Sequence, residues 1–316
     1  EYTRANIRSA LVYTFQKNFH AFNLTPVDLS IVNTLNLSLK FSEVLDSLRR
    51  NGNPIGLSFD QALVSSSSFT YTFNNAAKEK VRNIFLFRLQ VETGGNTIDA
   101  LARGLGNNNT DRIFGLRYFQ FNRFSLTVNY TKKLRKELAI AFRLQTGVAR
   151  PVGNSTSLPY EKFFFSGGNS SIRAWAPRRL GPGSFGTFDS TGRQTFLFEQ
   201  PGEIIFEANF EYRFPLFSYL KGALFVDAGN VWVIDNDAAR PGANFQANRF
   251  FREIAVGTGF GIRFDLSFLV VRLDFGIKVY NPALPPERRF VLPNFDFSNL
   301  FANEQMLLNI GIGYPF

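Results

Sequence analysis

The chain contains 316 residues, carries a formal net charge of +10 and has no cysteine, which excludes disulfides, thiolate metal sites and cysteine nucleophiles. Only 45% of its residues are hydrophobic, yet 38 are phenylalanine and 10 are tyrosine, and no apolar run is long enough for a transmembrane helix. The basic residues are scattered among the predicted strands and loops, so we expect no nucleic-acid partner.

The hydrophobic pattern has a period of two along most of the chain. In residues 203–214, EIIFEANFEYRF, apolar side chains alternate with glutamate, asparagine and arginine, which predicts a β-strand with one apolar and one polar face. The predicted strands lie, in chain order, at about 5–16, 27–37, 66–75, 82–93, 121–132, 138–147, 203–214, 220–233, 253–265, 268–280 and 305–316.

The length of these strands decides between two classes of all-β protein. Each predicted strand has roughly ten to fourteen residues, whereas a strand of a globular protein has about 5–6 and a membrane-spanning strand needs about 9–11. Charged residues share one face and phenylalanines the other, as in a barrel with a polar lumen and a lipid-facing exterior. The pattern therefore predicts an all-β, transmembrane antiparallel β-barrel, and a large soluble β-sandwich is the alternative.

The predicted connections alternate between short and long, as periplasmic turns and extracellular loops do in such barrels. One long connection contains residues 42–50, SEVLDSLRR, which predict a short amphipathic helix. The short connections lie near 17–22, 76–81, 132–137, 215–219 and 266–267, and the long ones near 38–65, 94–117, 150–202, 234–252 and 281–304.

The residue types needed for catalysis are missing or badly spaced. His20, the one histidine, is predicted in a short turn and cannot build a metal site alone. Glu207 and Glu211 lie four residues apart on one strand, roughly 13 Å, too far for a glycosidase pair. The glycines of residues 256–263, spaced by two, predict a smooth strand face and not a phosphate-binding turn. We therefore expect no enzyme, catalytic residue, metal or cofactor.

Residues 166–186, SGGNSSIRAWAPRRLGPGSFG, are unusually rich in glycine, proline and arginine for a surface loop. They resemble the signature of the long sixth extracellular loop of BamA/TamA-type outer-membrane assembly factors. Residues 210–217, 224–232 and 309–316 resemble later strands of that family, and the style of the loops resembles its Bacteroidetes members. The motif residues are Gly167, Gly168, Ile172, Arg173, Ala174, Trp175, Leu180, Gly181 and Pro182, with Ala174 where the family usually has glycine.

The resemblance implies a position for this loop. In the family, the loop folds back into the barrel lumen, where its arginine meets acidic residues on two strands. The matching residues are Arg173, Glu211 and Asp227, and a guanidinium group suits carboxylates because it binds them bidentately. The alternative is that Arg173, Arg178 and Arg179 are surface cations.

The resemblance also implies a function at the bacterial cell outer membrane. Members of the family insert or translocate β-barrel proteins through a lateral seam between their first and last strands. The expected partners are outer-membrane lipids or lipopolysaccharide, nascent β-barrel client proteins, and accessory lipoproteins or periplasmic subunits. The alternative function is a polypeptide-secreting or passive outer-membrane pore.

The strand count implies that residues 1–316 form one outer-membrane barrel domain that is incomplete at its N-terminal side. The family has sixteen strands, five of them after the long loop; the sequence predicts five after this loop but only six before it. The periplasmic POTRA modules are then absent from this chain as well.

The last predicted strand contains the expected seam residues Gly311, Gly313 and Phe316. Glycine weakens a strand, and Pro315 cannot donate to a ladder, so we expect poor pairing near this end. The resemblance implies a kink at Gly311, because this residue matches the position where the family's last strand kinks inward. The alternation places Tyr314 and Phe316 on the lipid-facing side, at the membrane interface. The alternative is that the aromatic strand serves only as the protein's own insertion signal.

Overall fold

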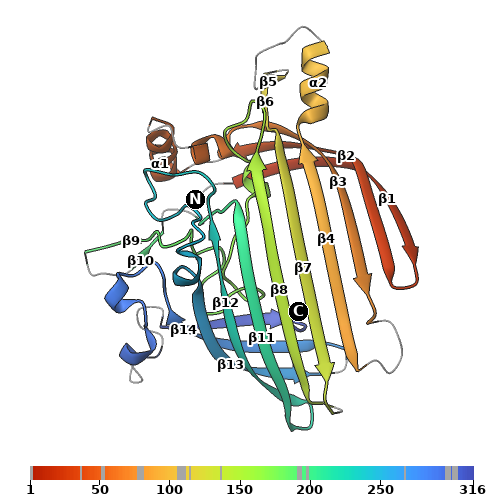
Figure 1. Ribbon diagram of the computed structural model, residues 1–316, viewed down its shortest axis with the longest axis vertical. Helices are drawn as coiled ribbons and strands as arrows, with labels where there is room; N and C mark the ends of the chain where they lie inside the picture. The colour runs from red at the N-terminus through yellow and green to blue at the C-terminus, as the bar shows by residue number, and fades with distance from the viewer. Residues whose placement is uncertain are drawn as a thin grey trace. The chain divides into compact units, whose positions relative to one another are not determined.

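The computed structural model describes residues 3–35, 38–50, 54–76, 82–104, 112–113, 115–135, 137–190, 194–196, 199–266, 268–295, 300 and 305–316. Parts of the predicted strand 27–37 and of several predicted connections, such as 76–81 and 281–304, lie outside these residues. The described residues form one large sheet with the hydrogen-bonded order β1-β2-β3-β4-β7-β8-β11-β12-β13-β14-β15 (Figure 1). The long strands that are neighbours in this order also follow one another along the chain.

The long strands span most of the predicted segments. Six precede the longest connection and five follow it among the described residues. They are β1 (Thr3–Lys17), β2 (His20–Leu35), β3 (Ala62–Asn74), β4 (Asn83–Gly94), β7 (Phe121–Lys133), β8 (Ala139–Pro151), β11 (Ile204–Phe217), β12 (Leu220–Trp232), β13 (Ala255–Asp265), β14 (Val270–Tyr280) and β15 (Met306–Ile312).

The connections contain short elements. The predicted helix at 42–50 is confirmed as α1 (Leu39–Arg50), and a second helix, α2 (Asn96–Gly104), was not predicted. The others are the strands β5 (Arg112–Ile113), β6 (Leu116–Tyr118), β9 (Thr187–Phe188) and β10 (Gln194–Thr195), and the 3₁₀ turns Pro54–Phe59, Tyr160–Lys162, Phe250–Arg252, Pro286–Arg288 and Leu292–Asn294.

The chain divides into two compact units. The first comprises residues 1–73, 88–125 and 147–163, and the second comprises 74–87, 126–146 and 164–316. In the first unit, β2 begins at His20, well before the predicted start of the strand at 27. The alternation of apolar and polar residues is interrupted around Pro26, so the pattern did not reveal this start. The register of β2 against β3 shifts between Thr25 and Asp28, and such a bulge accommodates a proline within a strand.

The predicted turn position of His20 was therefore wrong. His20 pairs with Lys17 as the first residue of β2. Its Nδ1 lies 2.8 Å from the hydroxyl of Tyr71 on β3, and its ring packs edge-on against Phe73. These contacts give the histidine a structural place at the end of the strand pair.

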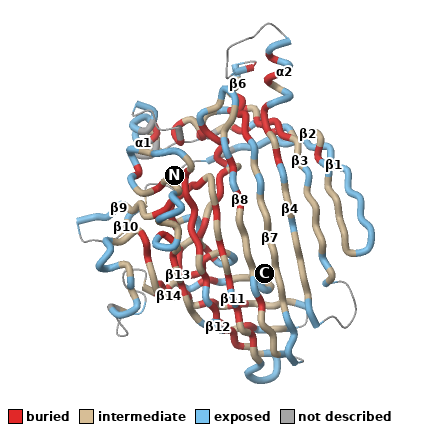
Figure 2. The backbone as a smooth tube through the Cα atoms, in the orientation of Figure 1, coloured by how far each residue is buried: buried red, intermediate tan, exposed pale blue. Residues whose placement is uncertain are grey.

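In the second unit, the middle of β11 and β12 buries polar side chains and exposes apolar ones. Buried and more exposed residues alternate there (Figure 2). On β11, Glu211 is fully buried whereas its neighbour Phe210 is 43% exposed. On β12, Asp227 is fully buried whereas Val226 is 45% exposed. A soluble sandwich would bury the opposite face, so this alternation is that of a strand with lipid on its apolar side.

The apolar face allows a direct test. Val226 lies in the middle of β12 and points to the apolar side. Val226→Arg should lower the free energy of unfolding by about 2–4 kcal/mol, because a guanidinium at the bilayer midplane is costly. Urea unfolding in phospholipid vesicles measures this, with Val226→Leu as the matched control. Equal stability of the two variants would contradict a lipid-facing position.

Candidate functional site

Within the second unit, part of the connection between β8 and β11 lies against the polar face of the sheet. Residues 166–180 form a closed hairpin within it, because Ser166 bridges to Leu180 and the Gly168 amide donates to the Trp175 carbonyl at 2.8 Å. The turn requires glycine: Gly167 has φ +100°, and a Cβ there would overlap the carbonyl oxygen of Ala176. We call residues 166–180 the loop hairpin.

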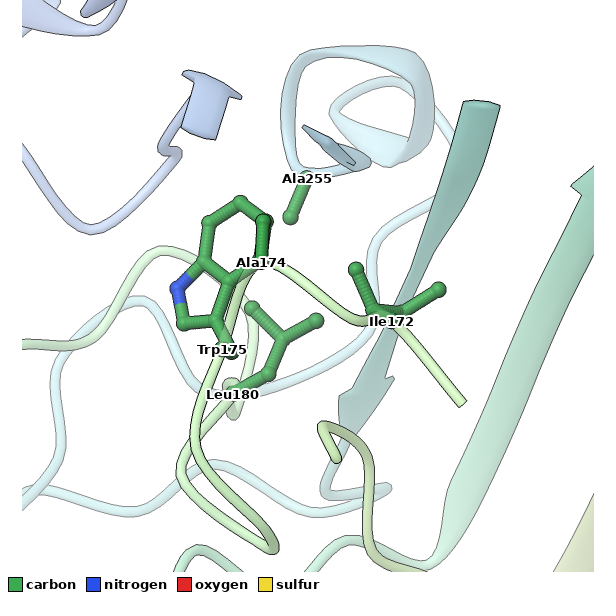
Figure 3. Close-up of a cluster of buried hydrophobic side chains, with 5 residues drawn as sticks. All are labelled: Ile172, Ala174, Trp175, Leu180 and Ala255. Carbon is green, nitrogen blue, oxygen red and sulfur yellow. The ribbon is translucent and has the colours of Figure 1, made fainter. Parts of the chain in front are cut away.

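An apolar cluster anchors the loop hairpin to β13. Ile172, Ala174, Trp175 and Leu180 are each at most 2% exposed and pack with Ala255, the first residue of β13 (Figure 3). The Lys278 ammonium on β14 lies 5.6 Å from the centre of the Trp175 ring, a cation–π distance. The motif's hydrophobic residues therefore fix the loop hairpin to the sheet and are not exposed to solvent.

Arg173 is the centre of the polar contacts. Its Nε and Nη2 donate to the two carboxylate oxygens of Asp227 at 2.8 and 2.9 Å, and its Nη1 donates to Glu211 at 2.5 Å. The Asp274 carboxylate lies 3.6 Å from Nη1. Arg173 is 1% exposed and the three acids are fully buried. The guanidinium also lies 3.5 Å from the centre of the Phe225 ring.

The three carboxylates keep Arg173 charged in spite of its burial. Burial alone disfavours a charged guanidinium, but the charges of Asp227, Glu211 and Asp274, together with the Asp227 hydrogen bonds, outweigh it and raise the pKa of Arg173. Charge-assisted, bidentate hydrogen bonds of this kind stabilise the contact and also fix the relative orientation of the guanidinium and the carboxylate. Arg173 therefore fixes the loop hairpin against β11, β12 and β14 at one point.

Further arginines surround the same acids. Arg263 of β13 donates to Glu211 at 3.1 Å, and its Nη1 lies 2.5 Å from Asp274, without hydrogen-bond geometry. Arg213 donates to Glu211 at 2.8 Å. We call the resulting group of four arginines and three acids the ion cluster, which consists of Arg173, Arg213, Arg263, Arg272, Glu211, Asp227 and Asp274.

Glu207, an acid outside the ion cluster, fixes the base of the loop hairpin. Glu207 accepts hydrogen bonds from the hydroxyls of Ser166, at 2.7 Å, and Ser171. Arg143 of β8 donates to the other carboxylate oxygen at 3.0 Å. The loop hairpin is thus hydrogen-bonded to β11 at both Glu207 and Glu211.

Two strand glycines make room for the loop hairpin. A Cβ on Gly276 of β14 would overlap the backbone of Arg173 and Ala174, and a Cβ on Gly257 of β13 would meet the Ala174 methyl group. Gly257 belongs to the glycine-rich strand face predicted at 256–263, and it leaves space for the methyl group of Ala174.

The structure brings Arg173, Glu211 and Asp227 together, as the resemblance implied. The sequence analysis missed Asp274, Arg263, Arg213 and Arg272 as members of the same cluster. Each stands on the polar face of its predicted strand, which was the available signal, but only the sheet order places them around one guanidinium. Arg178 differs from Arg173, because its side chain is half-exposed and 4.0 Å from Glu199.

The kink and the direction of the two aromatic side chains at the end of β15 differ from the prediction. β15 stays regular through Gly311, and the positive φ of +78° comes at Gly313, after the strand has ended. Tyr314 and Phe316 do not point to the lipid side. Their ring centres lie 4.4 and 5.7 Å from the Arg213 guanidinium, because the turn at Gly313 ends the alternation that the prediction extended to the last residue.

Removing the central cation tests the site. Arg173→Ala leaves Asp227 buried without its ion-pair partner, while Glu211 keeps Arg213 and Arg263, so the free energy of unfolding should fall by about 3–5 kcal/mol. Protease cleavage within residues 166–180 should rise in parallel. Arg178→Ala, a half-exposed arginine of the same loop hairpin, is the control and should change stability by less than about 0.5 kcal/mol. Similar effects from both variants would show that Arg173 does not hold the loop.

The close approach of loop and strand gives a second test. Gly276→Ala places a methyl group in the backbone of residues 173 and 174, so it should displace the loop hairpin and destabilise the protein by about 1–3 kcal/mol. Gly104→Ala is the matched control, since a Cβ there meets nothing within 4 Å. Protease sensitivity of the loop hairpin and urea unfolding report the effect. An unchanged loop in Gly276→Ala would contradict the contact.

Comparison with solved structures places this fold among outer-membrane barrels. CdiB from Escherichia coli superposes with a TM-score of 0.53 at 11% identity, over 98% of this chain and 44% of that one. BamA from Haemophilus ducreyi lacking POTRA domains 1–3 gives a TM-score of 0.39 at 13% identity, over 88% of this chain and 59% of that one. The chain thus spans less than half of the CdiB structure, and the likeness to CdiB is one of fold.

A family model supplies the assignment. No helix among the described residues is long and apolar enough to cross a membrane, and no curated protein matches the sequence. The model of the Omp85 superfamily domain matches residues 103–293, which is more than half of the chain and includes the loop hairpin and the ion cluster. The chain therefore belongs to the Omp85 superfamily and is a β-barrel protein of the bacterial outer membrane.

Proposed function

We propose that this protein assembles other β-barrel proteins in the outer membrane by pairing a client strand with the edge of β15. The observation that carries the proposal is the position of the loop hairpin, which is fixed to the polar face of the sheet by the ion cluster and also contacts β15. The Asn309 side chain on β15 donates to the Arg173 carbonyl at 2.8 Å. The loop motif and the strand edge are therefore parts of one site.

The loop hairpin argues against a passive pore. An open channel keeps its polar face in contact with water, whereas Arg173, Arg263, Glu211, Asp227 and Asp274 are each at most 1% exposed. Burying so many charges is favourable only when they are paired. The paired charges hold the loop hairpin against the polar face of the strands, which an open pore would leave in contact with water.

The character of β15 supports a role in strand pairing. β15 ends the hydrogen-bonded order of the described strands and has seven residues, fewer than the eleven of its neighbour β14. Its outward residues Leu308, Ile310 and Ile312 are 42%, 65% and 76% exposed. Unpaired backbone groups in lipid are costly, so a short apolar edge is a favourable template for an incoming strand.

Transport of a polypeptide is the second candidate. The second unit has a cavity of about 470 Å³, whose charged lining includes Lys133, Arg135, Arg213 and Lys221 together with the acid Glu137. A basic cavity would attract an acidic segment in transit. The proposed partners are nascent β-barrel clients for assembly or one exported polypeptide for transport, together with outer-membrane lipids and periplasmic or lipoprotein subunits in both.

Crosslinking in cells separates the candidates. Ile310→Cys on β15 should form a disulfide with a cysteine in the terminal strand of a nascent β-barrel client, because an assembling strand pairs with this edge. Val271→Cys on the interior strand β14 is the matched control and should give less than about a tenth of the adduct, since its backbone already pairs on both sides. Depletion of the protein should lower the levels of many outer-membrane barrels.

Transport predicts another pattern. Adducts would then form with cysteines facing the cavity, such as Lys133→Cys, along the whole length of one exported protein. In that case depletion would remove this secreted protein and leave the outer-membrane barrels at normal levels. Such a result would contradict the assembly proposal.

A further inference from the structure

The loop hairpin reaches β15 at a backbone acceptor. The Asn169 side-chain amide donates to the carbonyl oxygen of Ile310 at 3.2 Å. Asn169 comes from the tip of the loop hairpin and is exposed, so this hydrogen bond joins the most accessible part of the loop to the last strand.

The pairing of β14 with β15 defines the direction of that carbonyl. The amides of Gly313 and Lys278 donate to the carbonyls of Val270 and Gln305, so the odd-numbered residues of β15 form the hydrogen-bonded pairs with β14. Ile310 lies opposite Leu273 and belongs to the alternate, non-hydrogen-bonded pairs, whose backbone groups point away from the partner strand. Asn169 therefore occupies an acceptor on the outward edge of β15.

Two neighbouring contacts hold the tip of the loop hairpin at this position. Arg272 of β14 donates to the Ser170 hydroxyl at 3.2 Å, and Asn309 donates to the Arg173 carbonyl. Arg272 is also ion-paired with Asp274 at 2.9 Å, so the tip is connected to the ion cluster. The ion cluster holds the base of the loop hairpin, whereas the Asn169 side chain at the tip is exposed. The hydrogen bond of Asn169 can therefore break while the base stays in place.

We propose that Asn169 is an edge cap. It satisfies the outward carbonyl of Ile310 while no client is present, and an incoming strand displaces it by donating its own backbone N–H to the same oxygen. This inference rests on the proposed function and adds its regulation: the loop hairpin controls access to the edge of β15. An asparagine suits the role because its amide donates as a backbone amide does.

The test uses a strand probe that needs no cellular client. The full-length protein with Leu308→Cys is reconstituted in phospholipid vesicles and mixed with a synthetic peptide of sequence QMLLNIGIGYPF that carries an added cysteine. Asn169→Ala and Asn169→Asp both remove the donor, the second with little change of size. Each should raise the initial rate of disulfide formation with the peptide about two- to tenfold, the factor that corresponds to the loss of one hydrogen bond.

Two further variants separate capping from a general loosening of the loop. Ser170→Ala removes one of the two contacts that hold the tip, but the Asn309 hydrogen bond to the Arg173 carbonyl remains, so Asn169 stays on the edge acceptor and the rate should stay within about twofold of the parent. Asn169→Gln keeps an amide donor and should restore part of the protection. A rate unchanged in Asn169→Asp, or equally raised in Ser170→Ala, overturns the edge cap. If Asn169→Ala does not fold, the Asp and Gln variants give the answer.

The same variants in cells, with a cysteine-bearing nascent barrel as the probe, separate this inference from the proposed function. Raised adduct yields with both probes support both. A response of the peptide without any client adduct overturns the assembly function and leaves the edge cap supported. Client adducts whose yield does not depend on residue 169 overturn the edge cap and leave the assembly function supported.

Discussion

The buried pairing of Arg173 with Asp227 and Glu211 is the interaction on which the rest of the site depends. Each group would be unfavourable in this position alone, because a buried charge without a partner costs several kcal/mol. Together they join a loop to β11 and β12 with bidentate geometry. Arg213 and Arg263 also donate hydrogen bonds to Glu211, one to each carboxylate oxygen. The loop hairpin therefore has one favourable position on the sheet.

The ion pairs of Arg173 require the backbone of the loop hairpin to lie close to the strands. The loop can approach the strands closely enough for these hydrogen bonds only because Gly276 and Gly257 leave space beneath residues 173 and 174. Once seated, the loop hairpin places its tip beside β15, where Asn169 and Ser170 make their contacts. The motif thus acts on the last strand indirectly: charge pairing fixes the base, and the base positions the tip.

Strand alternation was sufficient to predict the strands and their two faces, because lipid on one side and buried charge on the other impose a period of two over long segments. The family resemblance supplied Arg173 and its two acids. Asp274 and Arg263 could not be predicted as members of the ion cluster. Many residues share their position on the polar face of a strand, and the contact between these two depends on the register of the strands. The prediction also failed where backbone geometry overrides the pattern, at the bulge near Pro26 and at Gly313.

A reversible lock between loop and edge tests the central claim that the seated loop hairpin controls β15. Ser170 and Gly311 both lie beside the Arg272 side chain. The double variant Ser170→Cys/Gly311→Cys is therefore oxidised to join them by a disulfide, and its formation is checked by the mass of a proteolytic fragment that contains both cysteines. The measurement is the rate of client-barrel insertion into vesicles with the oxidised and then the reduced protein. The account predicts insertion reduced at least about tenfold when oxidised and restored by reductant; oxidised protein that inserts clients at the reduced rate would contradict it.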